Sequence, residues 1–152
     1  MIHVLQSSQI INATIDRAWD FFSDPRNLSR ITPPELDFKV LTALPERIHP
    51  GMMIEYRVRP LLGIPVRWLT EITHVEQGKF FVDEQRIGPY RIWHHEHYFK
   101  KVDGGVIMTD KLYYAIGKSV FGWLAGKLFV HKKVKAIFEF RAKQLEELFG
   151  KK

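Results

Sequence analysis

Through the middle of the chain, large side chains recur at every second position, which is the spacing of a strand with one buried face. The clearest case is the run of Trp93, His95, His97 and Phe99. Similar alternation, interrupted by Gly, Pro and Asp turn residues, predicts strands over residues 3–11, 38–44, 52–58, 66–75, 80–87, 91–101 and 106–116. Residues 60–65 contain two prolines and a glycine and are expected to form a loop.

Other segments follow a helical period. The first comes after residues 12–14 and has i, i+3, i+4, i+7 spacing at Ile15, Ala18, Trp19 and Phe22. It should end before Pro25, because proline disfavours helix in the residue before it, and a second short helix or turn should follow through Leu28. The last segment is expected to open at Gly117 and Ser119 as one long helix. Its apolar stripe comprises Phe121, Leu124, Leu128, Val134, Phe138, Leu145 and Leu148.

Consecutive strands joined by short turns imply an antiparallel sheet, and such a sheet must bury one face. The long C-terminal helix is the obvious cover for that face. We therefore predict an α+β fold in which a curved antiparallel sheet of about six or seven strands wraps around this helix, with two short helices after the first strand. A chain of 152 residues without an internal repeat or linker fits a single domain over residues 1–152.

The dipeptide Asp103-Gly104 predicts a tight hairpin with positive φ angles and sets a specific register. If these residues form the turn, Val102 pairs with Gly105 and the pairing continues backwards along both strands. The opposed pairs are then Phe99 with Met108, His97 with Asp110, His95 with Leu112, and Trp93 with Tyr114. Most of these side chains are apolar, so they should form the inner face of the sheet. The register thus predicts a histidine opposite an aspartate inside an apolar face.

The strand before this hairpin adds two more polar candidates. Asp83 and Gln85 are in phase with Phe81, and alternation alone leaves open whether this set or its neighbours point inward. A bulge at the following Gly-Pro turn would bring Asp83 and Gln85 alongside His95 and Trp93.

Three interpretations of these polar residues stay open. The first is a satisfied buried hydrogen-bond network, because burying a carboxylate or an imidazole alone is costly. The second is a set of polar contacts at the bottom of an aromatic-lined ligand cavity. The third is metal binding or catalysis, since two histidines and a carboxylate could ligate zinc or iron and a His–Asp pair could act as a general base. His-x-His is a weak signal alone, so we expect no metal and no cofactor.

Composition narrows the classes of function. An aromatic content of 13% fits a well-filled core or an aromatic-lined pocket, and the absence of cysteine excludes disulfides and thiolate metal sites. We see no signal peptide and no apolar run near the ~18 residues needed to span a bilayer. The expected location is the cytoplasm.

The net charge of +6 raises the question of an anionic partner. Much of the excess lies in the C-terminal segment, at Lys127, His131, Lys132, Lys133, Lys135, Arg141 and Lys143. There the basic residues alternate with apolar ones, as on the solvated face of an amphipathic helix. We expect no nucleic-acid partner, because no recognition module accompanies the charge. Peripheral membrane contact through this helix stays an alternative.

The histidines lie within a motif that resembles a known superfamily. The motif comprises Phe81-x-Asp83-x-Gln85, Gly88-Pro89-Tyr90, Trp93, His95, His97 and Phe99, then Gly105, Asp110 and Tyr114, with Gly63-Ile64-Pro65, Trp68, Ile137-Phe138 and Arg141. Together these residues resemble the START-like superfamily, also called SRPBCC, which includes polyketide cyclases, coenzyme Q-binding proteins and the birch-pollen-allergen fold. The resemblance covers nearly the whole chain and implies the helix-grip fold, in which the sheet and the C-terminal helix enclose a deep apolar cavity.

The resemblance implies a carrier or sensor of a small hydrophobic ligand, such as a lipid, quinone or polyketide-like molecule. Side chains expected to line the cavity are Tyr56, Trp68, Trp93, Phe99, Met108 and Tyr114. Those expected to contact the polar end of the ligand are His95, His97 and Asp110, with Asp83 and Gln85 in addition. The alternative is a polyketide cyclase, aromatase or dehydratase in which the His97–Asp110 pair moves a proton. Only some members of the superfamily catalyse reactions, so binding is favoured.

Overall fold

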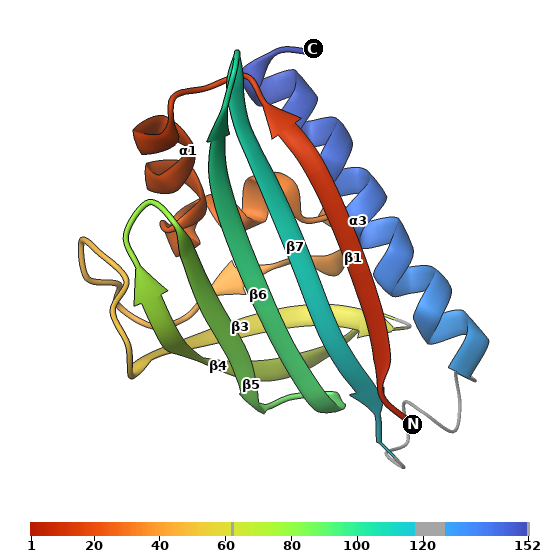
Figure 1. Ribbon diagram of the computed structural model, residues 1–152. Coiled ribbons are helices and arrows are strands. Elements are labelled where there is room, and N and C mark those ends of the chain that lie inside the picture. The colour runs from red at the N-terminus through yellow and green to blue at the C-terminus, as the bar shows by residue number, and fades with distance from the viewer. Residues whose placement is uncertain (62, 118–126, 152) are drawn as a thin grey trace.

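The computed structural model describes residues 1–61, 63–117 and 127–151 (Figure 1). Within these residues the strands are β1 (His3–Ile11), β2 (Lys39–Val40), β3 (Met52–Leu61), β4 (Ile64–Glu76), β5 (Phe80–Ile87), β6 (Tyr90–Val102) and β7 (Gly105–Ile116). They form one antiparallel sheet in the order β1-β7-β6-β5-β4-β3-β2. Strands β2 to β7 thus form a meander, and β1 closes the sheet beside β7.

The described helices are α1 (Ile15–Phe22), the 3₁₀ helices η1 (Pro25–Ile31) and η2 (Pro34–Leu36), and α3 (Lys127–Phe149). Thr14 begins α1 because its side-chain oxygen accepts the backbone N–H of Arg17, and Asp24 caps η1 in the same way through Arg26. Figure 1 shows a strongly curved sheet with α3 running along β1. The predicted helix-grip fold is confirmed.

Two predicted boundaries in the first half of the sheet are wrong. The strand expected over residues 38–44 is reduced to Lys39–Val40, and the expected loop at 60–65 is largely strand, because β3 continues to Leu61 and β4 begins at Ile64. The short β2 leaves the end of β3 at the edge of the sheet, where a proline needs no ladder partner for its missing N–H. The pairing of β3 with β4 is accordingly irregular between Val58 and Leu61.

Near the start of the described part of α3, the buried residues differ from the predicted apolar stripe. Val134, Phe138 and Leu145 are buried as expected, but Leu128 is 69% exposed. The expected helix start at Ser119, with Phe121 and Leu124, lies outside the described residues.

The hairpin register between β6 and β7 is as predicted at every pair. Val102 pairs with Gly105, and His97 lies opposite Asp110. Only Gly104 of the two turn residues has a positive φ, of 79°. The tight turn therefore needs a left-handed conformation at one position, not two.

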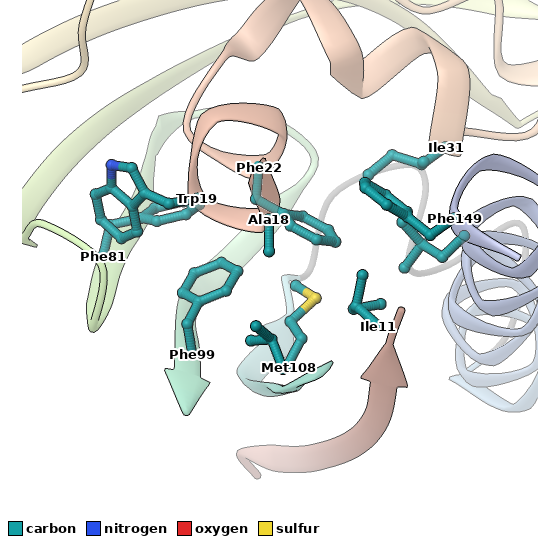
Figure 2. Close-up of a cluster of buried hydrophobic side chains, with 11 residues drawn as sticks. Ile11, Ala18, Trp19, Phe22, Ile31, Phe81, Phe99, Met108 and Phe149 are labelled. Atoms are coloured by element: carbon teal, nitrogen blue, oxygen red, sulfur yellow. The ribbon is translucent and has the colours of Figure 1, made fainter. Parts of the chain in front are cut away.

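Aromatic side chains close one end of the space between the sheet and the helices. Trp19 of α1 makes edge contacts with Phe81 and Phe99, at ring-centre distances of 5.9 and 5.5 Å. Figure 2 shows these rings with Met108 of β7 and Phe149 of α3 in one buried cluster. This cluster fills the part of the inner face where Phe99 and Met108 lie.

Gly105 lies where β7 starts beside the end of β1. A Cβ added there would lie 2.3 Å from the backbone carbonyl oxygen of Ile11, which cannot swing aside as a side chain could. We expect Gly105→Ala to lower the free energy of unfolding by about 2–3 kcal/mol, measured by urea unfolding. Gly51→Ala is the control, because Gly51 has φ +83° but nothing within 4 Å, and should cost about 1 kcal/mol. Equal losses would contradict the role of the close approach.

Candidate functional site

Three adjacent strands bring four ionisable side chains to one place on the inner face of the sheet. Asp83 of β5 pairs with His95 of β6, and His97, two residues further along β6, pairs with Asp110 of β7. All four point to the same side because side chains alternate along a strand. His95, His97 and Asp110 are buried, and the Asp83 side chain is 18% exposed. We call these four residues the His–Asp cluster.

Each histidine of the cluster lies between the two carboxylates. Nε2 of His95 is 2.9 Å from Oδ1 of Asp110, and its Nδ1 is 3.9 Å from Oδ2 of Asp83. Nε2 of His97 is 2.7 Å from the same Asp83 oxygen. Nδ1 of His97 lies 2.9 Å from Oδ1 of Asp110, although the direction of approach is not that of a hydrogen bond. The two imidazole rings are in close contact, with centres 3.8 Å apart and planes tilted by 40°.

The pKa values of the two histidines are shifted in opposite directions. Burial lowers the pKa of His95, and the neighbouring His97 lowers it further. Burial also acts to lower the pKa of His97, but Asp110 and Asp83 outweigh it and raise that pKa above the ordinary value. For Asp110, burial opposes ionisation, yet Arg141 and the two histidines hold its pKa well below the usual range. The same balance lowers the pKa of Asp83. The pKa shifts therefore favour the ionised form of both carboxylates and make His97 the more basic of the two histidines.

Arg141 of α3 supplies a further buried charge beside the cluster. Its side chain is 11% exposed, and Nη1 lies 3.4 Å from Oδ1 of Asp110. The guanidinium carbon lies 5.1 Å from the ring centre of Phe138. Its Nε is buried without a hydrogen-bond partner among the described residues. The expectation that the basic residues of this helix form a solvated face is therefore wrong at Arg141.

A partly enclosed cavity of about 180 Å³ lies against the cluster. Asp83, His95, His97 and Arg141 contribute to its wall, whereas Asp110 lies behind them. The rest of the wall comes from α1, η1 and η2, from strands β3 and β4 of the same sheet, and from the segments between these elements. Aromatic side chains that line the cavity are Phe21, Phe22, Phe38, Tyr56, Trp68, Phe81, Tyr90 and Trp93. The cavity thus has a mainly apolar wall with one ionisable patch.

The structure brings six of the sequence-predicted site residues to this cavity. They are Tyr56, Trp68, Asp83, Trp93, His95 and His97. Trp68 and Trp93 meet edge to face, with ring centres 5.0 Å apart and planes at 88°.

Three predicted cavity-lining residues lie elsewhere. Phe99 and Met108 share the inner face with the histidines, but they belong to the closed aromatic cluster of Figure 2 because α1 packs onto that end of the sheet. Tyr114 lies beyond the other end, in a cluster with Val134 and Phe138 of α3. Its hydroxyl is 2.6 Å from Nδ1 of His131. A shared sheet face is therefore not enough to place a side chain in the cavity.

Gln85 forms a clamp across the β5–β6 turn, outside the cavity lining. Its side-chain amide donates to the carbonyl of Tyr90, and its side-chain oxygen accepts the backbone N–H of the same residue. Gly88 lies directly against the side chain of Gln85. A Cβ at position 88 would be 2.3 Å from Oε1 of Gln85.

We expect Gln85→Ala to lower the free energy of unfolding by about 1–2 kcal/mol, because two partly buried backbone groups of Tyr90 lose their side-chain partner. Urea unfolding measures this loss. Arg86→Ala is the matched control: Arg86 pairs with Glu71 and Glu84 on the outer face and should contribute below about 1 kcal/mol. An equal effect of the two substitutions would contradict the clamp.

Sequence reasoning missed two residues of the cavity wall on α3, Lys133 and Arg141, by placing them on a solvated face. One signal was available for Arg141, which is three residues after Phe138 and four before Leu145, on the apolar stripe of the helix. A charged residue at such a position requires a buried partner, which is Asp110.

Solved structures with little sequence similarity share this architecture. Protein CV1439 from Chromobacterium violaceum is 14% identical, with a TM-score of 0.73 and coverage of 98% of this chain and 99% of that chain. Ara h 8.0201 is 12% identical, with a TM-score of 0.68 and coverage of 98% of each chain. The di-domain ARO/CYC protein StfQ from the steffimycin biosynthetic pathway is 11% identical, with a TM-score of 0.71 and coverage of 97% of this chain and 51% of that chain. No protein-family model and no curated protein sequence matches the chain.

These likenesses, with the seven-stranded sheet of the described residues and the long C-terminal helix, define the fold: the chain has a helix-grip fold. At these identities the likeness concerns the fold alone, and function must be argued from the site.

Proposed function

We propose that this protein binds a compact molecule with an apolar body and one polar end, as a carrier or sensor. The observation that carries the proposal is the cavity itself. It is a mainly apolar space of about 180 Å³ whose wall includes the ionisable side chains of Asp83, His95 and His97. A purely structural hydrogen-bond network needs no open apolar space in front of it. Such a space beside a few convergent polar groups is the usual form of a ligand site.

The dimensions and polarity of the cavity describe the ligand. Its volume of about 180 Å³ is below the roughly 300–1,000 Å³ common for drug-sized ligands, which favours a small ring system, such as a quinone or a polyketide-like fragment, over a long-chain lipid. His97 and Arg141 supply donors, and the carboxylate of Asp83 supplies an acceptor. A hydroxyl, carbonyl or carboxylate at one end of the ligand would match these groups.

Native mass spectrometry of protein purified from its own host tests the proposal. A ligand of this class is expected to remain bound in gentle ionisation, as a defined added mass that disappears on denaturation. Protein that is consistently empty, and that also fails to bind small aromatic alcohols added in solution, would contradict the proposal.

Catalysis of the cyclase, aromatase or dehydratase type is the second candidate. The observation in its favour is the contact of 2.7 Å between Nε2 of His97 and Asp83, because both residues line the cavity and could exchange a proton with a bound molecule. Asp110, the partner expected from the sequence, lies 2.9 Å from Nδ1 of His97 on the far side of the ring, without hydrogen-bond geometry. Turnover of a polyketide-like substrate that stops with His97→Ala would favour this candidate over a carrier.

Peripheral membrane contact stays a prediction. No helix in the described part of the chain is long and apolar enough to cross a membrane. Lys132 and Lys135 are exposed on α3, whereas Lys133 contributes to the cavity wall. Replacing Lys132 and Lys135 by glutamate should therefore affect membrane contact without changing the cavity wall. Loss of binding to anionic vesicles, with the cavity ligand retained, would support the contact.

A further inference from the structure

We propose that Asp83, His95 and His97 form a binding site for a divalent transition-metal ion, with coordination positions open to the cavity. One nitrogen of each histidine and one oxygen of Asp83 lie within 4.8 Å of one another. This inference goes beyond ligand binding and does not depend on it, because it concerns the bare ion.

On the side away from the cavity, the cluster has a carboxylate of the kind that supports the histidines of a metal site. A histidine that binds a metal through one ring nitrogen usually directs the other to a carboxylate, which fixes the orientation of the ring. Asp110 has this position for His95, whose Nε2 donates to its Oδ1 at 2.9 Å, and the same oxygen lies 2.9 Å from Nδ1 of His97 without hydrogen-bond geometry. Nδ1 of His95 and Nε2 of His97 are then directed to Asp83 at the cavity wall.

The two hydrogen bonds of the cluster leave a ring nitrogen available to a cation. A neutral imidazole carries one proton, and each ring makes one hydrogen bond to a carboxylate, from Nε2 of His95 to Asp110 and from Nε2 of His97 to Asp83. With the proton of His95 on Nε2, the lone pair of its Nδ1 faces the carboxylate of Asp83 at 3.9 Å. A metal ion at this point would bind Nδ1 of His95 and Asp83, and would bind Nε2 of His97 once the proton of that ring lies on Nδ1, 2.9 Å from Asp110.

Two of the three donor separations lie on either side of the value for a bound ion, and the third, between one nitrogen of each histidine, is within 4.8 Å. Donors bonded to zinc at about 2.0–2.2 Å in a tetrahedron lie roughly 3.4 Å apart. The observed separations from Oδ2 of Asp83 are 2.7 Å to His97 and 3.9 Å to His95, which bracket that value. Two imidazoles and one carboxylate suit Zn²⁺ or Fe²⁺ rather than Mg²⁺ or Ca²⁺, which prefer all-oxygen sites. Three protein ligands leave at least one position for water or for an oxygen atom of a cavity ligand.

Zinc titration of the full chain, stripped with chelator, tests the site. Calorimetry is expected to show one Zn²⁺ per chain and no comparable uptake of Mg²⁺. Asp83→Asn keeps the size of the side chain and should weaken Zn²⁺ binding by at least about 100-fold, because loss of a ligand should exceed the 10–100-fold cost of losing an outer partner. His94→Ala is the matched control, since His94 is the neighbouring residue on the outer face, between Glu84 and Glu96. The His94→Ala variant should bind Zn²⁺ with the affinity of the wild-type protein.

A second measurement needs no substitution. In the ¹⁵N spectrum of the wild-type protein, the ring resonances of His95 and His97 should shift on addition of one equivalent of ZnCl₂, and those of His94 should not. No uptake of Zn²⁺, or binding that survives Asp83→Asn and is lost with His94→Ala, would overturn the inference. Binding of a small aromatic alcohol to the metal-free protein is measured separately, so failure of the metal site and failure of the ligand site are distinguishable.

Discussion

Replacing Asp110 by asparagine is expected to lower the free energy of unfolding by about 3–5 kcal/mol, because the substitution leaves buried positive charge without its counter-charge. The Asp110 side chain is 7% exposed and lies within 3.4 Å of both histidines and Arg141. Asparagine keeps the shape, so the loss reports charge and hydrogen bonding, not an empty space. Urea unfolding at neutral pH measures it.

Two further variants show whether this loss comes from the unpaired charge. Glu84→Gln removes a carboxylate from the outer face, where Glu84 is 28% exposed and pairs with Arg86 and His94, and should cost below about 1 kcal/mol. Adding Arg141→Met to Asp110→Asn should recover part of the stability, because the unpaired guanidinium is then replaced by an apolar side chain. A double variant less stable than Asp110→Asn alone would contradict the explanation.

Replacing Trp68 by alanine is expected to weaken binding of a small aromatic alcohol about 10–100-fold. Trp68 lines the cavity and packs edge to face on Trp93, so its removal takes away one aromatic wall. Loss of the contacts of one large side chain costs about 1.5–3 kcal/mol, and each 1.4 kcal/mol is a tenfold change in affinity. Calorimetric titration with 2-naphthol, which has an apolar body and one hydroxyl, measures the effect.

Arg67→Ala is the control for this prediction, because Arg67 is the preceding residue of β4. It is directed to the other face, where its side chain is 76% exposed and pairs with Glu55. Its substitution should leave 2-naphthol affinity unchanged. Equal weakening by the two substitutions would place the binding site away from the cavity.

The β6–β7 half of the site was predictable from the sequence, because a two-residue turn and a period of two fix which side chains face one another. Asp103-Gly104 therefore predicted the opposition of His97 and Asp110, which the structure confirms. The inward direction of Asp83 was not predictable. It depends on the pairing of β5 with both neighbours, and the pairing with β4 has irregularities that alternation does not reveal.

The extent of the cavity was not predictable, because it depends on which part of the inner face the helices cover. Phe99 and Trp93 are in phase on the same strand, yet α1 packs against Phe99 and leaves Trp93 beside open space. Gln85 is also in phase with Asp83, but its side chain folds back over its own turn. These are properties of tertiary packing, which periodicity along one strand cannot report.

The three interpretations of the His–Asp cluster apply to different sides of it. Asp110 and Arg141 form the buried rear, where stability is expected to depend on charge pairing. Asp83 and the two histidines form the cavity wall, where a ligand or a metal ion would bind. A structural role for the rear is thus compatible with a binding role for the front.

A crystal structure of the protein purified from its own host, without added ligand, tests the central proposal most directly. We predict continuous non-protein electron density in the cavity, in contact with Trp68 and Tyr56 at its apolar end and with His97 or Asp83 at its polar end. A cavity that holds only separate ordered waters, or one filled by rearranged protein side chains, would contradict the proposal that this protein binds a small hydrophobic molecule.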